Sequence, residues 1–512
     1  MLRLAVALVA LTTNVVLPGG PVQAAATGTL VSSGESIQAA LDAAPAGGTV
    51  LVEPGTYLEN LTFRGKDVTL KSTGGPSVTL LDGGGVAPAV RFTGGETRAA
   101  RVEGFTIRHG GRGPAEWPYP EGAVWSWYAD PSIVGNVVEQ TRLCGGGAIY
   151  AEFSAPLIEN NIIRDNAVDG CYYPYGGGIS IQGDDNPGIP LIRGNTIERN
   201  KQHNGGGIGL YAAGRVRIEH NIIRDNEAIG GEGGGIALVN ANAVELVGNL
   251  IEGNNKAAIG GSLPSSLPGE GLGLNVVNNT IVSGGGPAID LWYAAPVQIA
   301  GSALVAGAGS PVLRCRGPLP DPWGMTDSLV WNGRSAPLYE GESGPCGVAP
   351  GAGGVVDADP AFVAAGSDFR VRPESAAVDA GYPVGDYWLT ATDLAGAPRV
   401  TDGNGDGVAR IDMGAYETGP GGTSPPGAPE ALQLRKSGSS ITARWSPPAY
   451  NGGAAVTGYE VTLEPGGRFL TLPAGTTTAT FSGLSRKTTY TVTVRAVNSA
   501  GAGAAATASI RL

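Results

Sequence analysis

Leu157-Ile-Glu-Asn-Asn-Ile-Ile-Arg-Asp-Asn166 is repeated with small changes along this chain, and the repeat limits which folds are possible. Copies with the same order of residue types begin at Leu191, Arg217 and Leu246. The central Asn of the pattern recurs every 25 to 34 residues, at Asn136, Asn161, Asn195, Asn221, Asn249 and Asn279. A period of this length is typical of proteins built from stacked structural repeats.

A glycine-rich motif recurs in phase with the Asn motif. Its copies are Gly145-Gly-Gly-Ala-Ile149, Gly176-Gly-Gly-Ile179, Gly205-Gly-Gly-Ile208 and Gly233-Gly-Gly-Ile236. Each period thus holds three short strands: one after the glycines, one before the Asn and one after it. Because one such turn cannot bury its apolar side alone, the turns must stack, with alternate Ile and Val side chains pointing inward.

The repeats predict an all-β protein containing a right-handed parallel β-helix solenoid. An Asn repeated at one corner can adopt a left-handed backbone there and bond to the backbone of the stacked turn. The main alternative, a leucine-rich horseshoe, needs a shorter and stricter repeat of Leu, which this sequence lacks.

The composition excludes several other classes of protein. Of 512 residues, 85 are Gly, 42% are hydrophobic and 15% are charged. A disordered polar chain would carry fewer hydrophobic residues, a coiled coil would be poor in Gly, and collagen would place Gly at every third position. The formal net charge of -12 argues against a basic surface for nucleic acid. We expect no nucleic-acid partner and a monomeric protein.

Motifs at both ends of the repeats suggest a family. Ser36-Ile-Gln-Ala-Ala-Leu-Asp-Ala-Ala-Pro45 predicts an amphipathic helix, with Ser36 or Ser33 as its cap, over the open end of the solenoid. Three further segments accompany this helix: a possible first turn from Gly47 to Tyr57, and two C-terminal motifs, Asp368 to Ser375 and Ile411 to Glu417. With these motifs, residues 28–417 resemble the pectin-lyase-like β-helix superfamily of secreted bacterial proteins. Such a resemblance implies the fold and leaves the reaction open.

A different domain follows the repeats. Residues 418–429 are rich in Gly and Pro, which predicts a flexible linker. Residues 430–512 resemble a fibronectin type III domain: Trp445 and Tyr459 suit its core, and Leu484 with Tyr490 suits a tyrosine corner. The resemblance implies a β-sandwich that serves as a spacer.

The N-terminus predicts secretion. Arg3 precedes an apolar run from Leu4 to Leu11, and Val22-Gln-Ala24 suits cleavage after Ala24, so residues 1–24 are predicted to be a signal peptide. The run is too short for a membrane span. An extracellular or periplasmic protein with four Cys is expected to form two disulfides. Three pairings are possible, and the sequence-local one joins Cys144 to Cys171 and Cys315 to Cys346.

The glycine-led strands predict a ligand-binding face. If Ile149 and its equivalents point inward, the residues one and three positions later point outward. The outward positions, with the loops that enter these strands, give a predicted substrate-binding set: Trp125, Trp127, Tyr150, Tyr172, Tyr173, Tyr211, Asp290 and Trp292. Six steps of about 4.8 Å span about 29 Å, which suits a stretched oligosaccharide. The alternative is that these aromatic residues only pack under the loops.

Two sets of residues could carry catalysis. A glycosidase needs two facing carboxyl groups, and Glu152 with Asp169 of the next loop could supply them. A polysaccharide lyase needs a base and a cation, for which His203 and Lys201 are candidates. The catalytic motifs of polygalacturonases, pectate lyases and alginate epimerases are missing from the sequence.

A possible calcium loop lies near the end of the repeat region. Asp402, Asn404 and Asp406 alternate around glycines, the Val408 carbonyl could add a ligand, and Asp412 could close the site. The loop departs from the EF-hand pattern, because the closing acid is Asp at position eleven rather than Glu at twelve. A plain turn is the alternative. We expect at most a structural calcium ion and no organic cofactor.

Together these features predict a secreted protein active on a polysaccharide, a lyase or a glycoside hydrolase for an acidic or a plant or algal glycan. The alternative is a non-catalytic glycan-binding or adhesin-like surface protein. A carbohydrate esterase is a third possibility, suggested only by the resemblance of the first turn.

Overall fold

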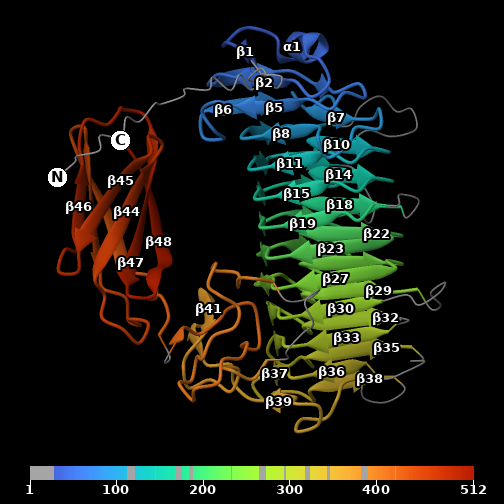
Figure 1. The fold of residues 1–512 in the computed structure, drawn as a ribbon, viewed down its shortest axis with the longest axis vertical. Coiled ribbons are helices and arrows are strands. Elements are labelled where there is room, and N and C mark those ends of the chain that lie inside the picture. Colours follow the sequence, from blue (N-terminus) through green and yellow to red (C-terminus); the bar gives the residue numbers. More distant parts are fainter. Residues whose placement is uncertain are drawn as a thin grey trace, which may run out of the picture.

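The computed structural model describes residues 28–111, 121–143, 146–168, 176–183, 188–231, 233–264, 273–292, 296–317, 323–342, 346–381, 390–420 and 423–512. Its larger part is a parallel β-solenoid, and a β-sandwich domain follows it (Figure 1). The predicted signal peptide, residues 1–24, lies outside the described residues. In the part of the chain that the structure describes, no helix is both long and apolar enough to cross a membrane.

Three long sheets of parallel strands form the sides of the solenoid. The pre-Asn sheet contains β1 (Thr29–Val31), β2 (Thr49–Val52), β5 (Thr69–Ser72), β8 (Arg101–Glu103), β11 (Ser132–Val134), β15 (Leu157–Glu159), β19 (Leu191–Arg193), β23 (Arg215–Glu219), β27 (Ala243–Val247), β30 (Leu274–Val277), β33 (Val297–Ala300) and β36 (Gly324–Thr326). The post-Asn sheet contains β3 (Gly55–Leu58), β6 (Thr79–Asp82), β9 (Thr106–Arg108), β12 (Val137–Glu139), β16 (Ile162–Arg164), β20 (Thr196–Glu198), β24 (Ile222–Arg224), β28 (Leu250–Glu252), β31 (Thr280–Val282), β34 (Ala303–Val305), β37 (Leu329–Trp331) and β39 (Val356–Asp357).

The third side is the glycine sheet, whose central strands follow the glycine motif. It contains β4 (Leu61–Thr62), β7 (Val90–Phe92), β10 (Val124–Trp127), β14 (Ile149–Glu152), β18 (Ile179–Gln182), β22 (Ile208–Tyr211), β26 (Ile236–Val239), β29 (Ile259–Ser262), β32 (Ile289–Trp292), β35 (Leu313–Arg316) and β38 (Tyr339–Gly341). A short sheet precedes it in four turns: β13 (Arg142–Leu143), β17 (Ala167–Val168), β21 (Lys201–Gln202) and β25 (Glu227–Ala228).

The repeated Asn side chains form a buried ladder between the pre-Asn and post-Asn sheets. The Oδ1 of Asn221 accepts from the backbone N–H of Asn195 at 2.9 Å, and its Nδ2 donates to the carbonyl of Ile192. The same bonds link the turns from Asn136 to Asn279. The predicted bonding to the stacked turn is therefore present. The left-handed residue, however, is the one before each Asn, such as His220 at φ 54°.

A second ladder was not predicted. It runs through Asn166, Asn200, Asn226 and Asn254 at the next corner, where Asn226 Oδ1 accepts from the backbone N–H of Asn200 at 3.0 Å. Each buried amide satisfies backbone groups that the corner leaves unpaired. Both ladders thus hold the register of neighbouring turns.

The N-terminal end of the solenoid is covered by α1 (Ile37–Ala43). Ser36 is its N-cap and accepts from the backbone N–H of Ala39, and Ile37 and Leu41 join the solenoid core. The predicted cap helix is therefore confirmed.

Residues 362–381 and 390–420 form a C-terminal block against the post-Asn side of the solenoid. It contains β40 (Phe362–Ala364) and β41 (Asp368–Val371), and Met413 packs with Ala303 and Leu329 of the solenoid. The guanidinium of the buried Arg399 lies 2.7 Å from Glu417 and donates to the Asn278 carbonyl. These contacts attach the block to the turns.

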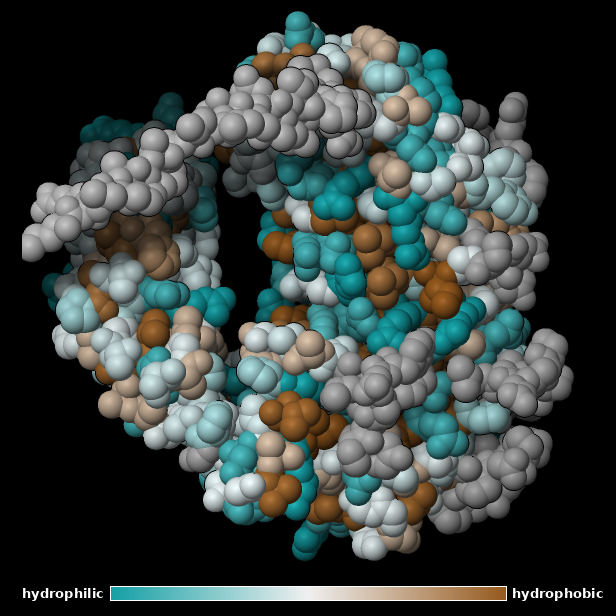
Figure 2. Space-filling view, viewed as in Figure 1, coloured by the Kyte–Doolittle hydropathy of each residue, from teal (hydrophilic) through white to brown (hydrophobic). Residues whose placement is uncertain are grey.

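The C-terminal domain is a two-sheet sandwich with its own core. One sheet contains β42 (Glu430–Ser437), β43 (Ser440–Ser446) and β46 (Thr478–Phe481); the other contains β44 (Gly458–Glu464), β45 (Arg468–Pro473), β47 (Thr489–Asn498) and β48 (Gly501–Arg511). The Tyr490 hydroxyl accepts from the backbone N–H of Ser485 at 2.9 Å, which is the predicted tyrosine corner. Figure 2 shows this domain standing beside the solenoid turns.

Candidate functional site

The glycine sheet carries two columns of outward side chains in register. Ile149, Ile179 and Ile208 are paired with one another and lie in the core, so the intervening positions face away from it. The inner column holds Arg91, Trp125, Tyr150, Ser180, Gly209, Ala237, Gly260, Asp290 and Arg314. The outer column holds Trp127, Glu152, Gln182, Tyr211, Val239, Ser262, Trp292 and Arg316.

The glycine motifs lie against the inner column. A Cβ built on Gly176 would collide with the backbone of Gly209, and one on Gly233 would lie 3.0 Å from the Cα of Ala237. The small residues of the inner column therefore leave space for the backbone of the glycine motifs, and they do not form a ligand-binding surface. Trp125 and Tyr150, predicted to bind substrate, are outward but only 4% and 7% exposed.

The outer column is the more accessible one. Trp127, Tyr211 and Trp292 are half-buried and share this column at intervals of three turns. We call the outer column the strip. Figure 1 shows the glycine sheet on the side of the solenoid away from the C-terminal domain. The strip is therefore the part of the predicted site that a large ligand could contact.

Glu152 is the carboxylic acid of the strip. It lies between Trp127 and Gln182 in register and is 7% exposed. Burial raises the pKa of its carboxyl above the usual value. The Tyr150 hydroxyl beside it donates to Gln182 at 2.8 Å. Its predicted partner Asp169, and the predicted ligand-binding residues Tyr172 and Tyr173, lie outside the described residues.

The C-terminal turns of the glycine sheet carry two arginines that were not among the predicted site residues, Arg314 in the inner column and Arg316 in the strip. Arg316 Nη2 lies 2.6 Å from Asp290 Oδ2, and its guanidinium carbon lies 4.8 Å above the Trp292 ring. Arg314 bridges Asp290 and Glu340 at 3.4 and 2.9 Å. Asp290 is thus a buried carboxylate that forms ion pairs with Arg314 and Arg316 and positions their guanidinium groups. The alternation from Leu313 to Arg316 continues the pattern and could have revealed them.

The two residues of the predicted lyase set lie outside the strip. Lys201 belongs to β21 of the short sheet, and its Nζ lies 2.8 Å from Glu227. His203 follows β21 and packs against Gly230, where a Cβ would collide with the imidazole. The structure therefore brings Lys201 to an acid of the neighbouring turn, and does not bring it into the column of Glu152.

The predicted calcium residues are only partly together. Asp402 accepts backbone N–H groups of Gly405 and Gly407, and Asp406 accepts that of Val408. Asp412 is instead fully buried and accepts from the backbone N–H groups of Asp379 and Thr418. Among the described residues, no three His, Cys, Asp or Glu side chains are placed to hold a metal ion. The structure therefore separates Asp412 from the other residues of the predicted calcium ligand set.

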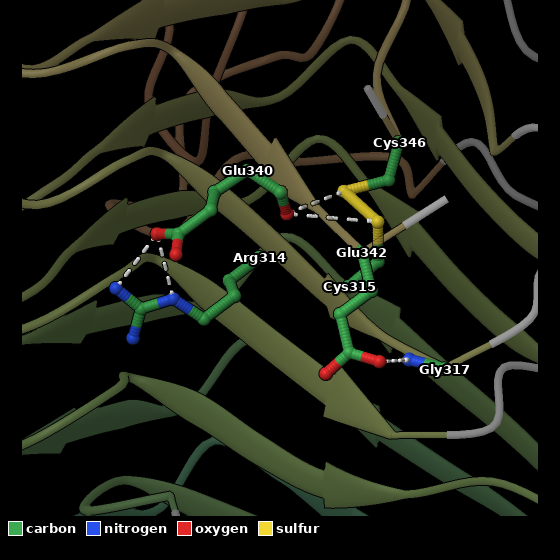
Figure 3. The surroundings of a disulfide bond; sticks show 6 residues. All are labelled: Arg314, Cys315, Gly317, Glu340, Glu342 and Cys346. Carbon is green, nitrogen blue, oxygen red and sulfur yellow. Dashed lines mark hydrogen bonds and ion pairs between the residues drawn. A yellow bond between two sulfur atoms is a disulfide. The ribbon is translucent and has the colours of Figure 1, made fainter. Parts of the chain in front are cut away.

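One predicted disulfide is present. Cys315 of β35 is bonded to Cys346, with their Cα atoms 6.0 Å apart, and both sulfurs lie near the Glu340 carbonyl (Figure 3). The bond fastens the segment after β38 to the last turns of the glycine sheet. The other predicted pair, Cys144 and Cys171, lies outside the described residues.

A separate cavity lies at the opposite side of the turns. It has a volume of about 400 Å³ and is lined by Glu159, Arg193, His220 and Asp393, among others. His220 Nε2 lies 3.1 Å from Thr390 Oγ1, and burial lowers the pKa of its imidazole. His220 thus contacts the C-terminal block, in keeping with a structural role.

Comparisons with known proteins agree with this architecture. Residues 92–304 match the family model described as right handed beta helix region, and residues 427–511 match that of the fibronectin type III domain. Two solved structures are each 22% identical to the chain over 17% of its length: "Myokine structure", of which 96% is covered, and the third fibronectin III domain of the human KIAA0343 protein, of which 82% is covered. Both have a TM-score of 0.15. The solenoid thus contains a right-handed β-helix region, and a fibronectin type III domain follows it.

Proposed function

We propose that this protein binds a polysaccharide along the strip, as a monomer outside the cell. The observation that carries the proposal is the spacing of Trp127, Tyr211 and Trp292, which recur at every third turn of one column. Three strand spacings amount to about 14 Å. An extended chain of pyranose rings lying along the solenoid axis would pass over all three rings, and its C–H faces suit aromatic surfaces.

Hydrolysis of that polysaccharide is the second candidate function, favoured by Glu152. A carboxyl group whose pKa is raised by burial keeps its proton nearer neutral pH and can act as a general acid. Asp169 remains the proposed second carboxylate. A lyase reaction through His203 and Lys201 has less support, because the Lys201 ammonium already pairs with Glu227.

The binding proposal is tested on a glycan array with the full chain. We expect binding to an extended polysaccharide, and weaker binding by Tyr211→Ala and Trp292→Ala. Phe469→Ala is the matched control, because Phe469 is 54% exposed on the C-terminal domain. Equal binding by all three variants would contradict the strip as the binding surface.

The reaction is tested on the polysaccharide that binds. Release of reducing ends that is lost in Glu152→Gln, without a rise in the absorbance of unsaturated sugars, supports hydrolysis. A rise in that absorbance supports a lyase. Binding without either product would mean that the protein binds the polysaccharide and does not cleave it.

We also propose a structural calcium ion at the loop of Asp402, Asn404 and Asp406. Their oxygens accept backbone N–H groups, but a carboxylate oxygen has a further lone pair for a cation. If calcium binds there, a chelator should lower the melting temperature of the wild type and leave that of Asp406→Ala unchanged. No response of the wild type to calcium or chelator would identify the loop as a plain turn.

A further inference from the structure

The corner that follows the glycine sheet requires a left-handed backbone in successive turns. The first corner residue has φ 47° at Tyr128, 50° at Phe153, 87° at Gly183, 44° at Ala212 and 54° at Asn240. Gly and Asn suit this conformation, whereas bulky side chains are uncommon in it. Two aromatic residues in adjacent turns therefore occupy positions where the backbone disfavours them.

Those two aromatic residues form one packed unit with the strip. The rings of Tyr128 and Phe153 are stacked, with centroids 4.9 Å apart and an interplanar angle of 14°. Trp127 meets Tyr128 edge-on at 5.0 Å. Phe153 lies over Gly183, where any Cβ would collide with its ring. Tyr128 is thus held by neighbours from two turns.

The aromatic unit is not part of the hydrophobic core. Trp127, Tyr128 and Phe153 lie outside the core cluster of the solenoid, and Tyr128 is 48% exposed. Burial of hydrophobic area therefore does not account for its aromatic side chain. A rigid, half-exposed ring beside Trp127 extends the surface of the strip around the corner.

We propose that the Tyr128 ring is a stacking platform for one neutral pyranose ring, at the N-terminal end of the strip. The proposal rests on the proposed function, because the same glycan would continue over Trp127 toward Tyr211. The cationic residue of the strip, Arg316, lies at its other end, in register with Trp292. No residue of the strip beside the platform can therefore pair with a uronate carboxylate, whereas a neutral ring needs no such partner.

The test compares variants of the full chain on a printed array of neutral and acidic polysaccharides, followed by titration of the best neutral oligosaccharide. Tyr128→Ala should weaken binding about tenfold, and Tyr128→Phe should bind like the wild type, because stacking needs the ring and not the hydroxyl. Gly183→Ala, which displaces Phe153, should weaken binding to an intermediate extent. Circular dichroism checks that each variant is folded.

The outcomes separate the platform from the strip. If Tyr211→Ala weakens binding and Tyr128→Ala does not, the platform is refuted while the strip stands. If neither variant changes binding, or if the array shows no binding at all, both are refuted. Exclusive binding to acidic polysaccharides refutes the neutral ring. Phe469→Ala again controls for the loss of an exposed aromatic side chain.

Discussion

Ile208 and Tyr211 belong to the same strand, β22, but have opposite surroundings. Ile208 is fully buried in the solenoid core, whereas Tyr211 is half-buried on the strip. Ile208→Ala should lower the free energy of unfolding by about 2–5 kcal/mol, because it leaves a cavity between stacked turns. Tyr211→Ala should lower the free energy of unfolding by a clearly smaller amount. Urea denaturation followed by circular dichroism measures both, and equal costs would show that Tyr211 belongs to the core.

Glu252 should make stability depend on pH. Burial, and then the charge of Asp225, raises the pKa of its carboxyl from 4.5 to about 7. A raised folded-state pKa contributes stability below about pH 4.5 that is lost as pH rises through about 7. Glu252→Gln should therefore match the wild type at pH 4 and be more stable at pH 8, by about 1–2 kcal/mol after allowance for partial exposure. Melting temperatures at the two pH values test this, and an equal difference at both would rule out titration of Glu252.

The direction of the side chains of β22 could be predicted from the sequence, but their exposure could not. Alternation fixes which side of the strand a residue occupies. It does not show that Gly176 and Gly233 bring backbone against the inner column. Trp125 and Trp127 therefore look alike in the sequence although they differ in accessibility. The surroundings of Asp412 depend on Asp379 and Thr418, which spacing around Gly407 cannot reveal.

The glycine motif allows the backbone of neighbouring turns to pack closely. Gly176→Ala should destabilise the solenoid by about 1–3 kcal/mol, because its Cβ would collide with the backbone of the Ile179 and Gly209 positions, which cannot rotate away. Gly475→Ala is the control, since nothing lies within 4 Å of its Cβ position. It should change stability by less than about 0.5 kcal/mol. Similar urea midpoints for the two variants would contradict this role of the motif.

The strands and their order follow from the repeat, while the second Asn ladder required the structure. Asn166 stands at the end of the quoted repeat, and its equivalents recur as regularly as Asn161. The period alone does not show that both corners are closed enough to bury an amide. The two arginines of β35 could not be placed from the sequence for a related reason: β35 lacks the glycine motif, so its alternation alone does not set Arg314 and Arg316 in register with Asp290 and Trp292.

The linker between the two domains is hydrogen-bonded at its C-terminal end. The buried Arg370 of the C-terminal block donates to the carbonyls of Pro425 and Pro426, and the Pro426 carbonyl also accepts from the backbone N–H of Ala504. Composition predicts a flexible linker over residues 418–429. These bonds connect its C-terminal end to the C-terminal block and to the sandwich.

Loss of this connection should free the C-terminal domain. We expect Arg370→Ala to speed proteolysis within residues 418–429 and to increase the radius of gyration in small-angle scattering. The melting of the sandwich itself should stay unchanged, because its core does not include Arg370. Arg372→Ala is the control, since Arg372 donates to Val363 inside the block. Unchanged proteolysis in Arg370→Ala would show that the bonds do not restrain the linker.

The Asn ladder has a consequence for how such a chain can change over evolutionary time. Each rung presents the same acceptor to the turn on one side and the same donor to the turn on the other, as Asn221 does between Asn195 and Asn249. A duplicated turn would find matching partners above and below, whereas half a turn would break the series. Gene duplication can thus lengthen this protein in units of one coil, and each added coil would extend the strip by one residue position.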